Sequence, residues 1–498
     1  MSVNSNINNL SILEADSLNS EFSEFMKETI PHLHNLVDTF KAGRLYNHYD
    51  FWKTLTSDKH ILQTVVGMDI EFIDLPSQYF IPPEYQHTPE EMAFLHQEIE
   101  KLLNKQVIRE VTHTPGEFVS NIFLREKRDG GFRMILNLKP PNKLVEYHKF
   151  KMETLKAVIN LVTPGCFMAS IDFKDAYYSV PIAKQFRKFL RFQFDNRLFE
   201  FACLPNGLSS GPRIFTKLTK PLFATLREKG HLNTVYIDDS ILFGDSMLEC
   251  MQNVIDTVIA ALKAGFVVHP DKSIFTPAQI IEFLGFIINS ILMTITLTRS
   301  KAVTLRELCE QLVSYNKPKI ITVAKVVGKM VAAFPGVQHG PLFYRLLDNE
   351  KTAALKLSKG NYQAKMKLSI QAKEDLLWWI ENIENSSKKI WIDNPTVVVY
   401  SDSSKTGWGG IYGNLTTGGN WSSEESLIHI NILELLAAYY TLASLCRHIR
   451  NTHVRIMVDN QTALAYINNM GGRTKVCNKV TRQIWDWCLE RGIWLSAA

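Results

Sequence analysis

Two adjacent carboxylates, Asp238 and Asp239, stand at the centre of the stretch NTVYIDDSILFG (233–244). Apolar, β-favouring runs flank them on both sides, which predicts a hairpin with the two acids at its bend. Successive side chains of a straight strand point to opposite faces, so both carboxylates can serve one site only if the chain turns sharply there. Paired carboxylates at such a bend could bind a hard divalent cation such as Mg2+. An Asp-Asp pair between strands is also common in ordinary turns, so the rest of the chain must decide.

A third acid, Asp172, lies in the stretch CFMASIDFKDAYYSVPI (166–182). The apolar residues before it predict a strand that ends there, and the end of a strand is where a sheet presents chemistry. The alternative is a helix cap, because DxxDA can begin a helix. Downstream, the Gly- and Ser-rich stretch LPNGLSSGPRIFTKL (204–218) leads into a helix, which favours close backbone approach and anion binding. It matches no free-standing phosphate-loop fingerprint, so an ordinary turn is the other interpretation.

The C-terminal region contains a second set of acids. Strand VVVY (397–400) precedes Asp402, a helix from about Asn431 contains Glu434, and strand HVRIMV (453–458) ends at Asp459. Acids at the ends of two strands and on one helix can converge at one edge of a mixed sheet. We therefore expect a second carboxylate cluster.

Other patterns indicate how the chain is organised. Its 498 residues suggest about three domains at roughly 150 residues each. The runs VSNIFL and FRMILNL flank a basic turn, KRDGG, and predict a hairpin with a charged tip, although a plain surface hairpin has the same pattern. Thr88-Pro89-Glu90-Glu91 is typical of a helix start. Two helical segments follow near 302–312 and 323–334. Residues 1–40 predict a flexible or partner-dependent extension, and a less patterned connector runs to about residue 395.

Composition and charge exclude some classes of protein. The chain is 46% hydrophobic and 21% charged, which is ordinary for a globular protein. No apolar run reaches the length of a membrane span and no secretory signal is visible, so we expect no membrane partner. Seven scattered cysteines favour a reducing, intracellular compartment, cytoplasmic or nuclear. The net charge is +5, and basic clusters at 125–156, 183–192 and 299–329 suit a phosphate backbone, although solvated surfaces give the same clusters.

Taken in order, these segments resemble reverse transcriptases over nearly the whole chain from about Thr88 to Ala498. IDFKDAYYSVPI and LPNGLSSGPRIF look like the first two palm motifs, YIDD matches the catalytic hairpin, and GFVVHPDKS and EFLGF look like the next two motifs. SDSSKTGWGG, ILELLAA and VDNQTALAYIN resemble the linked ribonuclease H domain. The phrases GGFRMILNLKPPN, HINILELLAA and AYINNMGG are most similar to DIRS-like retroelements, which as a family recombine with a tyrosine recombinase.

The resemblance implies an α+β multidomain fold, in which a right-hand polymerase of fingers, palm and thumb precedes a partial ribonuclease H-like α/β domain. The expected parts are an N-terminal extension and lead-in (1–87), fingers and palm (88–290), thumb (291–345), connection (346–395) and a ribonuclease H-like domain (396–498). The implied function is that of an RNA-directed DNA polymerase of a retrotransposon. Its implied partners are an RNA template, a DNA primer, an RNA–DNA hybrid and dNTPs.

The functional residues of the family carry over where the motifs match. Asp172, Asp238 and Asp239 would be the catalytic carboxylates that hold two Mg2+ ions. Tyr177 would lie against the sugar 2′ position and select deoxynucleotides. The resemblance also implies nucleotide contacts from Lys127, Arg133, Phe173, Asp175, Ala176, Asn206, Gly207 and Lys272, the last as a proton donor to pyrophosphate. It implies primer or template contacts from Phe283, Leu284, Gly285, Lys325 and Lys329, and ribonuclease H metal ligands at Asp402, Glu434 and Asp459.

Two departures from the family pattern affect these expectations. Asn206 stands where retroviral relatives have Gln and many retroelements have Phe. The sequence ends at IWLSAA, before the closing helix and fourth carboxylate of the ribonuclease H family, so we expect weakened metal binding and an impaired ribonuclease H. Two other functions stay open. One is a decayed or repurposed copy that binds nucleic acid without catalysis. The other is an RNA-directed RNA polymerase, against which Tyr177 and the RNA-cleaving domain argue.

Overall fold

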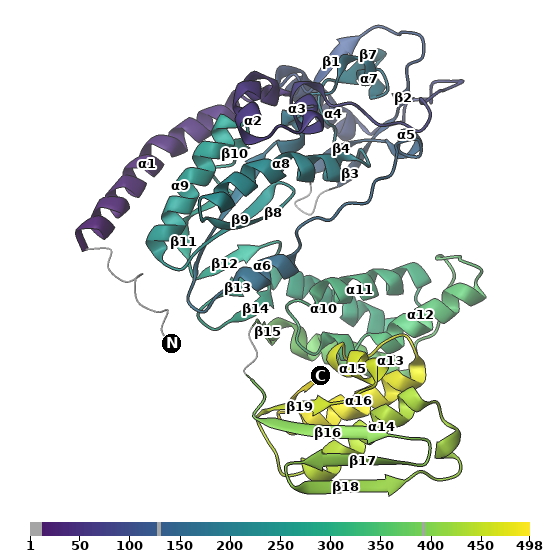
Figure 1. Ribbon diagram of the computed structural model, residues 1–498. Coiled ribbons are helices and arrows are strands. Elements are labelled where there is room, and N and C mark those ends of the chain that lie inside the picture. Colours follow the sequence, from purple (N-terminus) through teal and green to yellow (C-terminus); the bar gives the residue numbers. More distant parts are fainter. Residues whose placement is uncertain (1–11, 127–130, 391–393) are drawn as a thin grey trace. The chain divides into compact units, whose positions relative to one another are not determined.

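The computed structural model describes residues 12–126, 131–390 and 394–498, and Figure 1 shows its helices and strands. They form two compact units, Met1–Leu284 and Gly285–Ala498. Among the described residues, no helix combines the length and the apolar character needed to cross a membrane.

The first unit mixes helices and strands. Its helices are α1 (Ile12–Asp38), α2 (Tyr49–Leu55), α3 (Lys59–Gly67), α4 (Pro89–Asn104), α5 (Lys139–Asn142), α6 (Leu155–Leu161), α7 (Lys184–Arg187), α8 (Gly211–Glu228) and α9 (Met247–Lys263), with 3-10 turns η1 (Arg44–His48) and η2 (Ala176–Ser179). Its strands are β1 (Ile108–Val111), β2 (Val119–Ser120), β3 (Ile122–Glu126), β4 (Phe132–Leu136), β5 (Phe167–Lys174), β6 (Arg191–Phe194), β7 (Arg197–Phe201), β8 (Leu232–Tyr236), β9 (Asp239–Gly244), β10 (Val267–Val268), β11 (Ile274–Ala278) and β12 (Ile280–Phe283).

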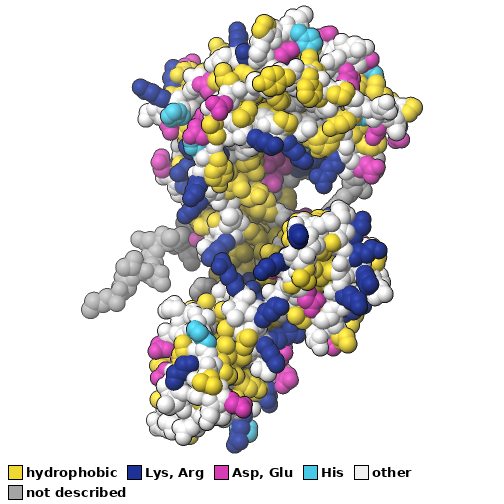
Figure 2. Space-filling view, turned by 90° about the vertical axis from the view of Figure 1, so that its right-hand side faces the viewer, with side chains coloured by type: hydrophobic (Ala, Val, Ile, Leu, Met, Phe, Trp, Pro, Cys, Tyr) yellow, Lys and Arg dark blue, Asp and Glu magenta, His cyan; other side chains and the backbone are white. Residues whose placement is uncertain are grey.

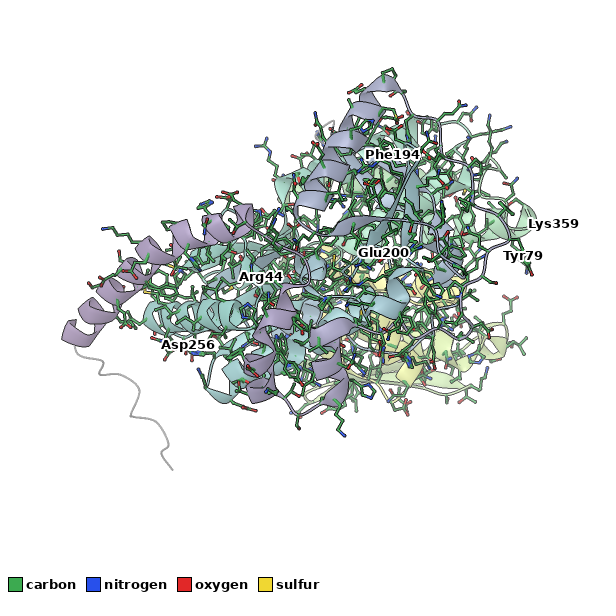
Figure 3. All side chains as sticks on the ribbon, turned by 90° about the horizontal axis from the view of Figure 1, so that it is seen from above. Arg44, Tyr79, Phe194, Glu200, Asp256 and Lys359 are labelled. Carbon is green, nitrogen blue, oxygen red and sulfur yellow. The ribbon has the colours of Figure 1, made fainter. Side chains whose placement is uncertain are left out.

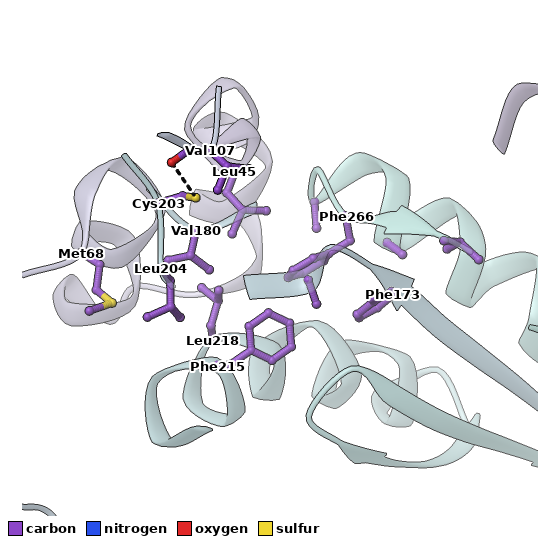
Figure 4. Packing of buried hydrophobic residues seen from close by; sticks show 14 of the residues in the cluster. Leu45, Met68, Val107, Phe173, Val180, Cys203, Leu204, Phe215, Leu218 and Phe266 are labelled. Carbon is purple, nitrogen blue, oxygen red and sulfur yellow. Dashed lines mark hydrogen bonds between the residues drawn. The ribbon is translucent and has the colours of Figure 1, made fainter. Parts of the chain in front are cut away.

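An antiparallel sheet in the order β10-β5-β9-β8 forms the centre of this unit, and β11 also pairs with β5. Helix α8 packs on β8, and α9 packs on β5 and β9. The core beneath the sheet is aromatic: the ring of Phe173 from β5 stacks on Phe266 at a centroid distance of 4.7 Å, and Phe215 of α8 meets Phe266 edge-on. Figure 4 shows this packing around Phe173, Phe215 and Phe266. Tight packing of large rings fixes β5, which carries Asp172, relative to α8.

The hairpin predicted around KRDGG is present as β3 and β4, which pair antiparallel from Ile122 with Leu136 to Glu126 with Phe132. A separate sheet in the order β1-β7-β6-β2 lies in the same half of the sequence. The predicted helix start is also confirmed, because Thr88 and Glu91 form a reciprocal capping box at the start of α4 and Pro89 occupies its first turn.

The prediction of a flexible N-terminal extension is wrong for residues 12–38. They form helix α1, which lies along α9 (Figure 1) and buries Phe22 and Leu33. Phe22, Met26 and Leu33 are spaced to share one helix face. The segment as a whole is mostly polar, so its average hydrophobicity does not indicate this apolar face. The chain continues into η1, which begins at Arg44 (Figure 3). The next helix, α2, is attached to the rest of the unit, because Trp52 donates a hydrogen bond of 2.8 Å to the carbonyl of Ala264.

The segment between α3 and α4 packs Phe72 against Phe189, at a centroid distance of 5.3 Å, but keeps its later aromatic residues at the surface. The side chain of Tyr79 is fully exposed at the periphery (Figure 3) and that of Phe80 is 75% exposed. Backbone bonds nevertheless tie the beginning of the segment to the rest of the unit, since Met68 donates to Pro181 and Ala183 donates to Met68. The lead-in is also attached further along, because Gln78 exchanges two hydrogen bonds with the backbone of Val119 and Asn121 donates one to the carbonyl of Pro83.

The second unit contains helices and a five-stranded sheet. Its helices are α10 (Arg299–Ser314), α11 (Ile320–Ala333), α12 (Arg345–Leu357), α13 (Ile370–Asn382), α14 (Ile430–Leu445), α15 (Gln461–Asn468) and α16 (Lys475–Leu489), with 3-10 turns η3 (Gly340–Leu342), η4 (Ile383–Asn385) and η5 (Glu425–Leu427). Its strands are β13 (Phe286–Asn289), β14 (Thr294–Leu297), β15 (Ser387–Lys389), β16 (Val397–Ser403), β17 (Gly407–Tyr412), β18 (Leu415–Asn420), β19 (His453–Met457) and β20 (Trp494–Ala497).

The two predicted helical segments are α10 and α11. They bury Leu305 and Cys309 on α10 and Val323 and Met330 on α11, as the apolar spacing predicts, whereas Val331, which the same spacing places on the buried face, is 45% exposed. The connector after them is more regular than its sequence suggests, because it forms α12 and α13, and Trp379 of α13 is fully buried. The C-terminal sheet has the order β18-β17-β16-β19-β20, with β16, β19 and β20 parallel to one another. It is the mixed sheet predicted for this region.

Candidate active site and a second carboxylate cluster

The YIDD stretch forms a tight hairpin between β8 and β9. Tyr236 pairs with Asp239 across the hairpin, so Ile237 and Asp238 alone make the turn. Ile237 has a positive φ of 58°, which a β-branched residue rarely adopts, and the surrounding sheet must hold it there. The predicted bend is confirmed, and it lets two successive carboxylates lie near one another.

Asp172 belongs to strand β5 and not to a helix cap. It lies directly opposite Asp239 in the β5–β9 ladder, and its own amide donates a hydrogen bond of 3.0 Å to Ser273 Oγ. The amide of Phe173 donates to the carbonyl of Asp238 at 3.0 Å. Strand pairing therefore brings together three acids that are up to 67 positions apart in the sequence.

These carboxylates repel one another at short range. Burial, and then the charge of Asp172, raise the pKa of Asp238. Burial, Asp238, Asp172 and a hydrogen bond with the Asp172 carboxyl raise the pKa of Asp239 to about 6. Nearby Lys272 lowers both values. Like charges held together in this way favour a bound cation, and carboxylate oxygens are the ligands that Mg2+ takes.

A cavity of about 350 Å³ adjoins the hairpin. Most of the predicted nucleotide-contacting residues line it, together with three that the sequence did not indicate, namely Lys174, Tyr178 and Ile237. The full lining is Asp172, Phe173, Lys174, Asp175, Ala176, Tyr177, Tyr178, Asn206, Ile237, Asp238 and Lys272. Strand β5 and the turn after it thus provide one wall, and the YIDD hairpin and Lys272 provide others.

Three predicted nucleotide contacts do not line this cavity. Arg133 is exposed on β4, opposite Arg125, and Gly207 lies beside the lining residue Asn206. Lys127 lies outside the described residues.

The backbone amide of Phe173 is not available to a nucleotide, because it is already bonded to the carbonyl of Asp238. The side chain of Phe173 is 2% exposed and belongs to the aromatic core. Beyond it, Asp175 adopts a left-handed backbone with φ 50°, and Ala176–Ser179 form a 3-10 turn. The chain leaves the strand at Asp175, so free amides can face the cavity only from that residue onward.

Tyr177 stands on the cavity wall against helix α8. Its ring lies 5.3 Å from that of Phe215, and a Cβ at Gly211 would come within 3.3 Å of it. Burial and the charge of Asp238 raise the pKa of Tyr177 to about 12. The side chain is therefore a neutral, sterically fixed phenol beside the carboxylates.

The loop around Asn206 is braced by a residue that the sequence did not single out. Asn142 donates a hydrogen bond of 2.9 Å to the carbonyl of Gly207, and its Oδ1 accepts one of 2.9 Å from the amide of Ser209. Gly207 has φ 100°, which favours glycine. Asn206 is exposed and donates to the Tyr178 hydroxyl at 3.5 Å. No sequence spacing links position 142 to position 207, so only the fold reveals this brace.

The predicted primer or template residues differ in exposure. Phe283 is 4% exposed in β12, and Leu284 and Gly285 have positive φ values of 50° and 73°. Lys325 and Lys329 are exposed on α11, off its buried stripe, as predicted.

The second carboxylate cluster forms at the edge of the C-terminal sheet. Asp402 on β16, Glu434 on α14 and Asp459 after β19 each offer an oxygen within 4.8 Å of the others. Glu434 is 3% exposed, and its Oε2 has no hydrogen-bond partner among the described residues. Burial, then Asp459 and Asp402, raise the pKa of Glu434 to about 7. A buried carboxylate with one oxygen left without a partner, close to two other carboxylates, is suited to a cation.

Comparison with known proteins agrees with the geometry of the first site. Residues 126–288 match the family of the reverse transcriptase (RNA-dependent DNA polymerase). The chain is similar to the Transposon Tf2-3 and Tf2-7 polyproteins of Schizosaccharomyces pombe, each 23% identical over 267 residues, which are 52% of this chain and 19% of the relative. The chain thus spans less than a fifth of the length of these relatives.

Solved structures give the same fold. The foamy viral protease-reverse transcriptase in complex with dsDNA is similar with a TM-score of 0.56 and 16% identity, over 86% of this chain and 88% of that one. Its complex with an RNA/DNA hybrid gives a TM-score of 0.53 and 16% identity, over 96% of this chain and 62% of that one. The right-hand polymerase architecture predicted from the sequence is confirmed. Asp172, Asp238 and Asp239 lie within the residues that match the reverse transcriptase family.

Proposed function

We propose that the chain is the RNA-directed DNA polymerase of a retrotransposon, which adds deoxynucleotides to a primer 3′-hydroxyl on an RNA template. The observation that carries the proposal is the cross-strand pair Asp172–Asp239 beside Asp238, at the mouth of a cavity lined by the Asp175–Tyr178 turn. Nucleotidyl transfer needs such an arrangement, because carboxylates must hold cations next to a site for a polyphosphate.

The donor set fits Mg2+. The three side chains are all carboxylates, and their mutual repulsion, seen in the raised pKa values of Asp238 and Asp239, is relieved by a bound cation. Two Mg2+ ions held there would activate the primer hydroxyl and neutralise the departing pyrophosphate. Asp172 and Asp238 would hold them, with Asp239 as the third carboxylate.

The cavity fits a deoxynucleoside triphosphate. The amides of Asp175 and Ala176 would donate to its phosphates, and Lys272 would lie near the pyrophosphate. Arg133, from the β3–β4 hairpin, would bind the phosphates, whose geometry Arg suits. A phosphate contact from Lys127 stays a prediction. The fixed ring of Tyr177 would clash with a ribose 2′-hydroxyl, which would exclude ribonucleotides.

Nucleic-acid substrates fit the surface charge. Lysine and arginine side chains recur beside exposed apolar side chains on the face shown in Figure 2, a combination suited to a phosphate backbone. The exposed Lys325 and Lys329 would contact the duplex, and Phe283, Leu284 and Gly285 would support the primer end through their backbone. The solved neighbours bind dsDNA and an RNA/DNA hybrid, which supports the same partners here.

The second cluster would be the metal site of a linked ribonuclease H that cleaves the RNA of the hybrid. Its support is the convergence of Asp402, Glu434 and Asp459. Impairment of this activity, the DIRS-like origin of the element and an intracellular, cytoplasmic or nuclear location stay predictions.

Primer extension tests the polymerase. With an RNA template, a DNA primer, dNTPs and Mg2+, the wild-type chain should extend the primer and Asp238→Asn should not. Asp245→Asn is the matched control, since Asp245 is an exposed acid just after the same strand β9. Extension by Asp238→Asn would remove the assigned site. Binding of the duplex without extension by the wild type, under Mg2+ and Mn2+, would support a nucleic-acid-binding copy that has lost catalysis.

A further inference from the structure

Lys105 contacts the turn that lines the nucleotide cavity, although it lies in another part of the fold. It follows the last residue of α4, and its Nζ lies 2.5 Å from Oδ2 of Asp175. Both side chains are 18% exposed. Asp175 is the residue whose left-handed backbone, with φ 50°, turns the chain out of strand β5 and into the cavity wall. The ion pair is thus formed at the point where the chain changes direction.

The residues before η1 hold Lys105 and the same turn. The Lys105 ammonium lies 5.5 Å from the centre of the Phe40 ring, and the Lys105 carbonyl accepts a hydrogen bond of 2.8 Å from Ala42. The next residue, Gly43, donates a hydrogen bond of 2.8 Å to the carbonyl of Tyr178. The turn is therefore fixed at its start by Lys105 and at its end by Gly43.

We propose that Lys105 is a positioning residue for nucleotide binding, which fixes the Asp175–Tyr178 turn and neutralises the Asp175 carboxylate beside the site of a nucleoside triphosphate. The inference rests on the proposed polymerase function, because it assigns that turn to the phosphates. Lys105 does not line the cavity itself, so it acts through Asp175.

Electrostatics gives the direction of the effect. A largely buried carboxylate that loses its partner keeps a charge that nothing compensates. Here that charge would lie on the cavity wall, where it would repel a triphosphate. The left-handed backbone at Asp175 costs free energy for a residue with a Cβ, so without the ion pair the turn would also lose a contact that holds it. Weaker nucleotide binding with little change in the chemical step should follow.

The test is steady-state primer extension on an RNA template with dTTP varied. Lys105→Met should raise the KM for dTTP roughly tenfold, which corresponds to a loss of about 1.4 kcal/mol in binding. It should change kcat and the Kd for the primer–template by less than about threefold, because neither depends on the turn. Lys105→Arg keeps the charge and should bring the KM to within about threefold of the wild type. Lys101→Met is the matched control, since Lys101 lies one turn earlier on α4, is exposed and forms its ion pair with Glu98 at 3.0 Å.

A double-mutant cycle separates positioning from a general role in stability. In an Asp175→Asn background there is no charge for Lys105 to neutralise, so Lys105→Met should then change the KM by less than about twofold. If Lys105 only stabilised α4 against Phe40, its removal would have the same effect in both backgrounds. Equal effects, or an unchanged KM in Lys105→Met, would overturn the inference.

The same experiment distinguishes the two proposals. If the wild type and Lys101→Met fail to extend the primer, the polymerase function itself fails. If Lys105→Met does not fold, as judged by its melting temperature, the Asp175→Asn/Lys105→Met variant replaces it. Recovery of folding and of a near-normal KM in that variant supports the pairing, and a tenfold higher KM in it refutes the pairing.

Discussion

The chain contains two carboxylate clusters that sheets assemble in different ways. In the first, Asp238 and Asp239 come from one hairpin and Asp172 from the neighbouring strand, all on a sheet whose other face packs against helices. In the second, Asp402 lies near the end of β16, Asp459 follows the parallel strand β19, and Glu434 comes from a helix. Among the described residues, the second triad brings three oxygens within 4.8 Å of one another, a criterion that the first does not meet.

The two clusters, which differ in how far apart their carboxylate oxygens lie, also differ in the residues and cavities around them. The wider first cluster adjoins a cavity and a lysine, Lys272, which lowers the pKa values of Asp238 and Asp239. The compact second cluster has exposed Asp402 and Asp459 around the buried Glu434. A spread set of acids beside a cavity leaves room for a polyphosphate between cations, whereas a compact set suits the cation itself. The comparison shows that two clusters of similar residue types differ in what adjoins them: a cavity and Lys272 in the first, and two exposed acids around a buried one in the second.

The largest expected effect comes from removing one acid of the first cluster, and the same change in the second cluster provides the comparison. Asp172→Asn should lower primer extension by about a thousandfold or more, because it removes a metal ligand at the reacting atoms. Asp402→Asn should leave extension within about twofold, because the second cluster has no part in nucleotidyl transfer. The measurement is extension of a labelled primer on an RNA template. A loss of extension in Asp402→Asn would mean that the two clusters are not independent.

A smaller effect should distinguish nucleotide selection from metal binding in the first cluster. Tyr177→Ala opens space beside the site of the sugar 2′ position and should reduce discrimination against ribonucleotides by roughly tenfold to a hundredfold. The quantity to measure is the ratio of kcat/KM for dTTP to that for UTP. Tyr178→Phe is the matched control, because Tyr178 lines the same cavity and the change keeps its ring. An unchanged ratio in Tyr177→Ala would assign its ring to packing against Phe215 alone.

The buried acid of the second cluster should show itself in the pH dependence of stability. The pKa of Glu434 is raised to about 7, so folding favours its neutral form. Its contribution is therefore most favourable below its ordinary pKa and is lost as the pH rises to about 7. At pH 8, Glu434→Gln should increase the free energy of unfolding by on the order of 2 kcal/mol, and Mn2+ should stabilise the wild type more than the variant.

Denaturant unfolding at pH 5 and pH 8, with and without Mn2+, measures this effect. Glu424→Gln provides the same substitution at an exposed position of the same domain. If the wild type were more stable than Glu434→Gln at pH 8 without metal, this result would contradict the prediction that burial of the Glu434 carboxylate disfavours its charged form.

Local signals made much of this fold predictable. The apolar, β-favouring runs on both sides of Asp238 predicted the hairpin, and the capping residues Thr88 and Glu91 predicted the start of α4. The mixed C-terminal sheet followed from strands that end at Asp402 and Asp459. Each of these signals lies within a few residues of the feature it predicts.

Contacts between distant parts of the chain could not be predicted in the same way. The brace from Asn142 to Gly207 and the ion pair from Lys105 to Asp175 join residues 65 and 70 positions apart. The order of α1 was hidden by its polar composition and by Pro31 within the helix. The acids themselves could thus be picked out from the sequence, whereas the contacts that hold them in place depend on tertiary packing.

The smallest expected effect concerns the outer face of α11, which bears on neither cluster directly. Lys325 and Lys329 are exposed there, and if each contacts a phosphate, replacing both with Ala should weaken primer–template binding a few-fold at 0.1 M salt. It should also reduce the slope of log K against log salt by about 2, because each lost phosphate contact removes about 0.9 from the slope.

Lys356→Ala with Lys359→Ala removes the same charge from exposed positions on and just after α12. An equal loss in both pairs would mean that net charge, and not the α11 face, determines binding. A loss confined to Lys325 and Lys329, with kcat unchanged, would show that duplex binding is separable from the chemistry at Asp172, Asp238 and Asp239.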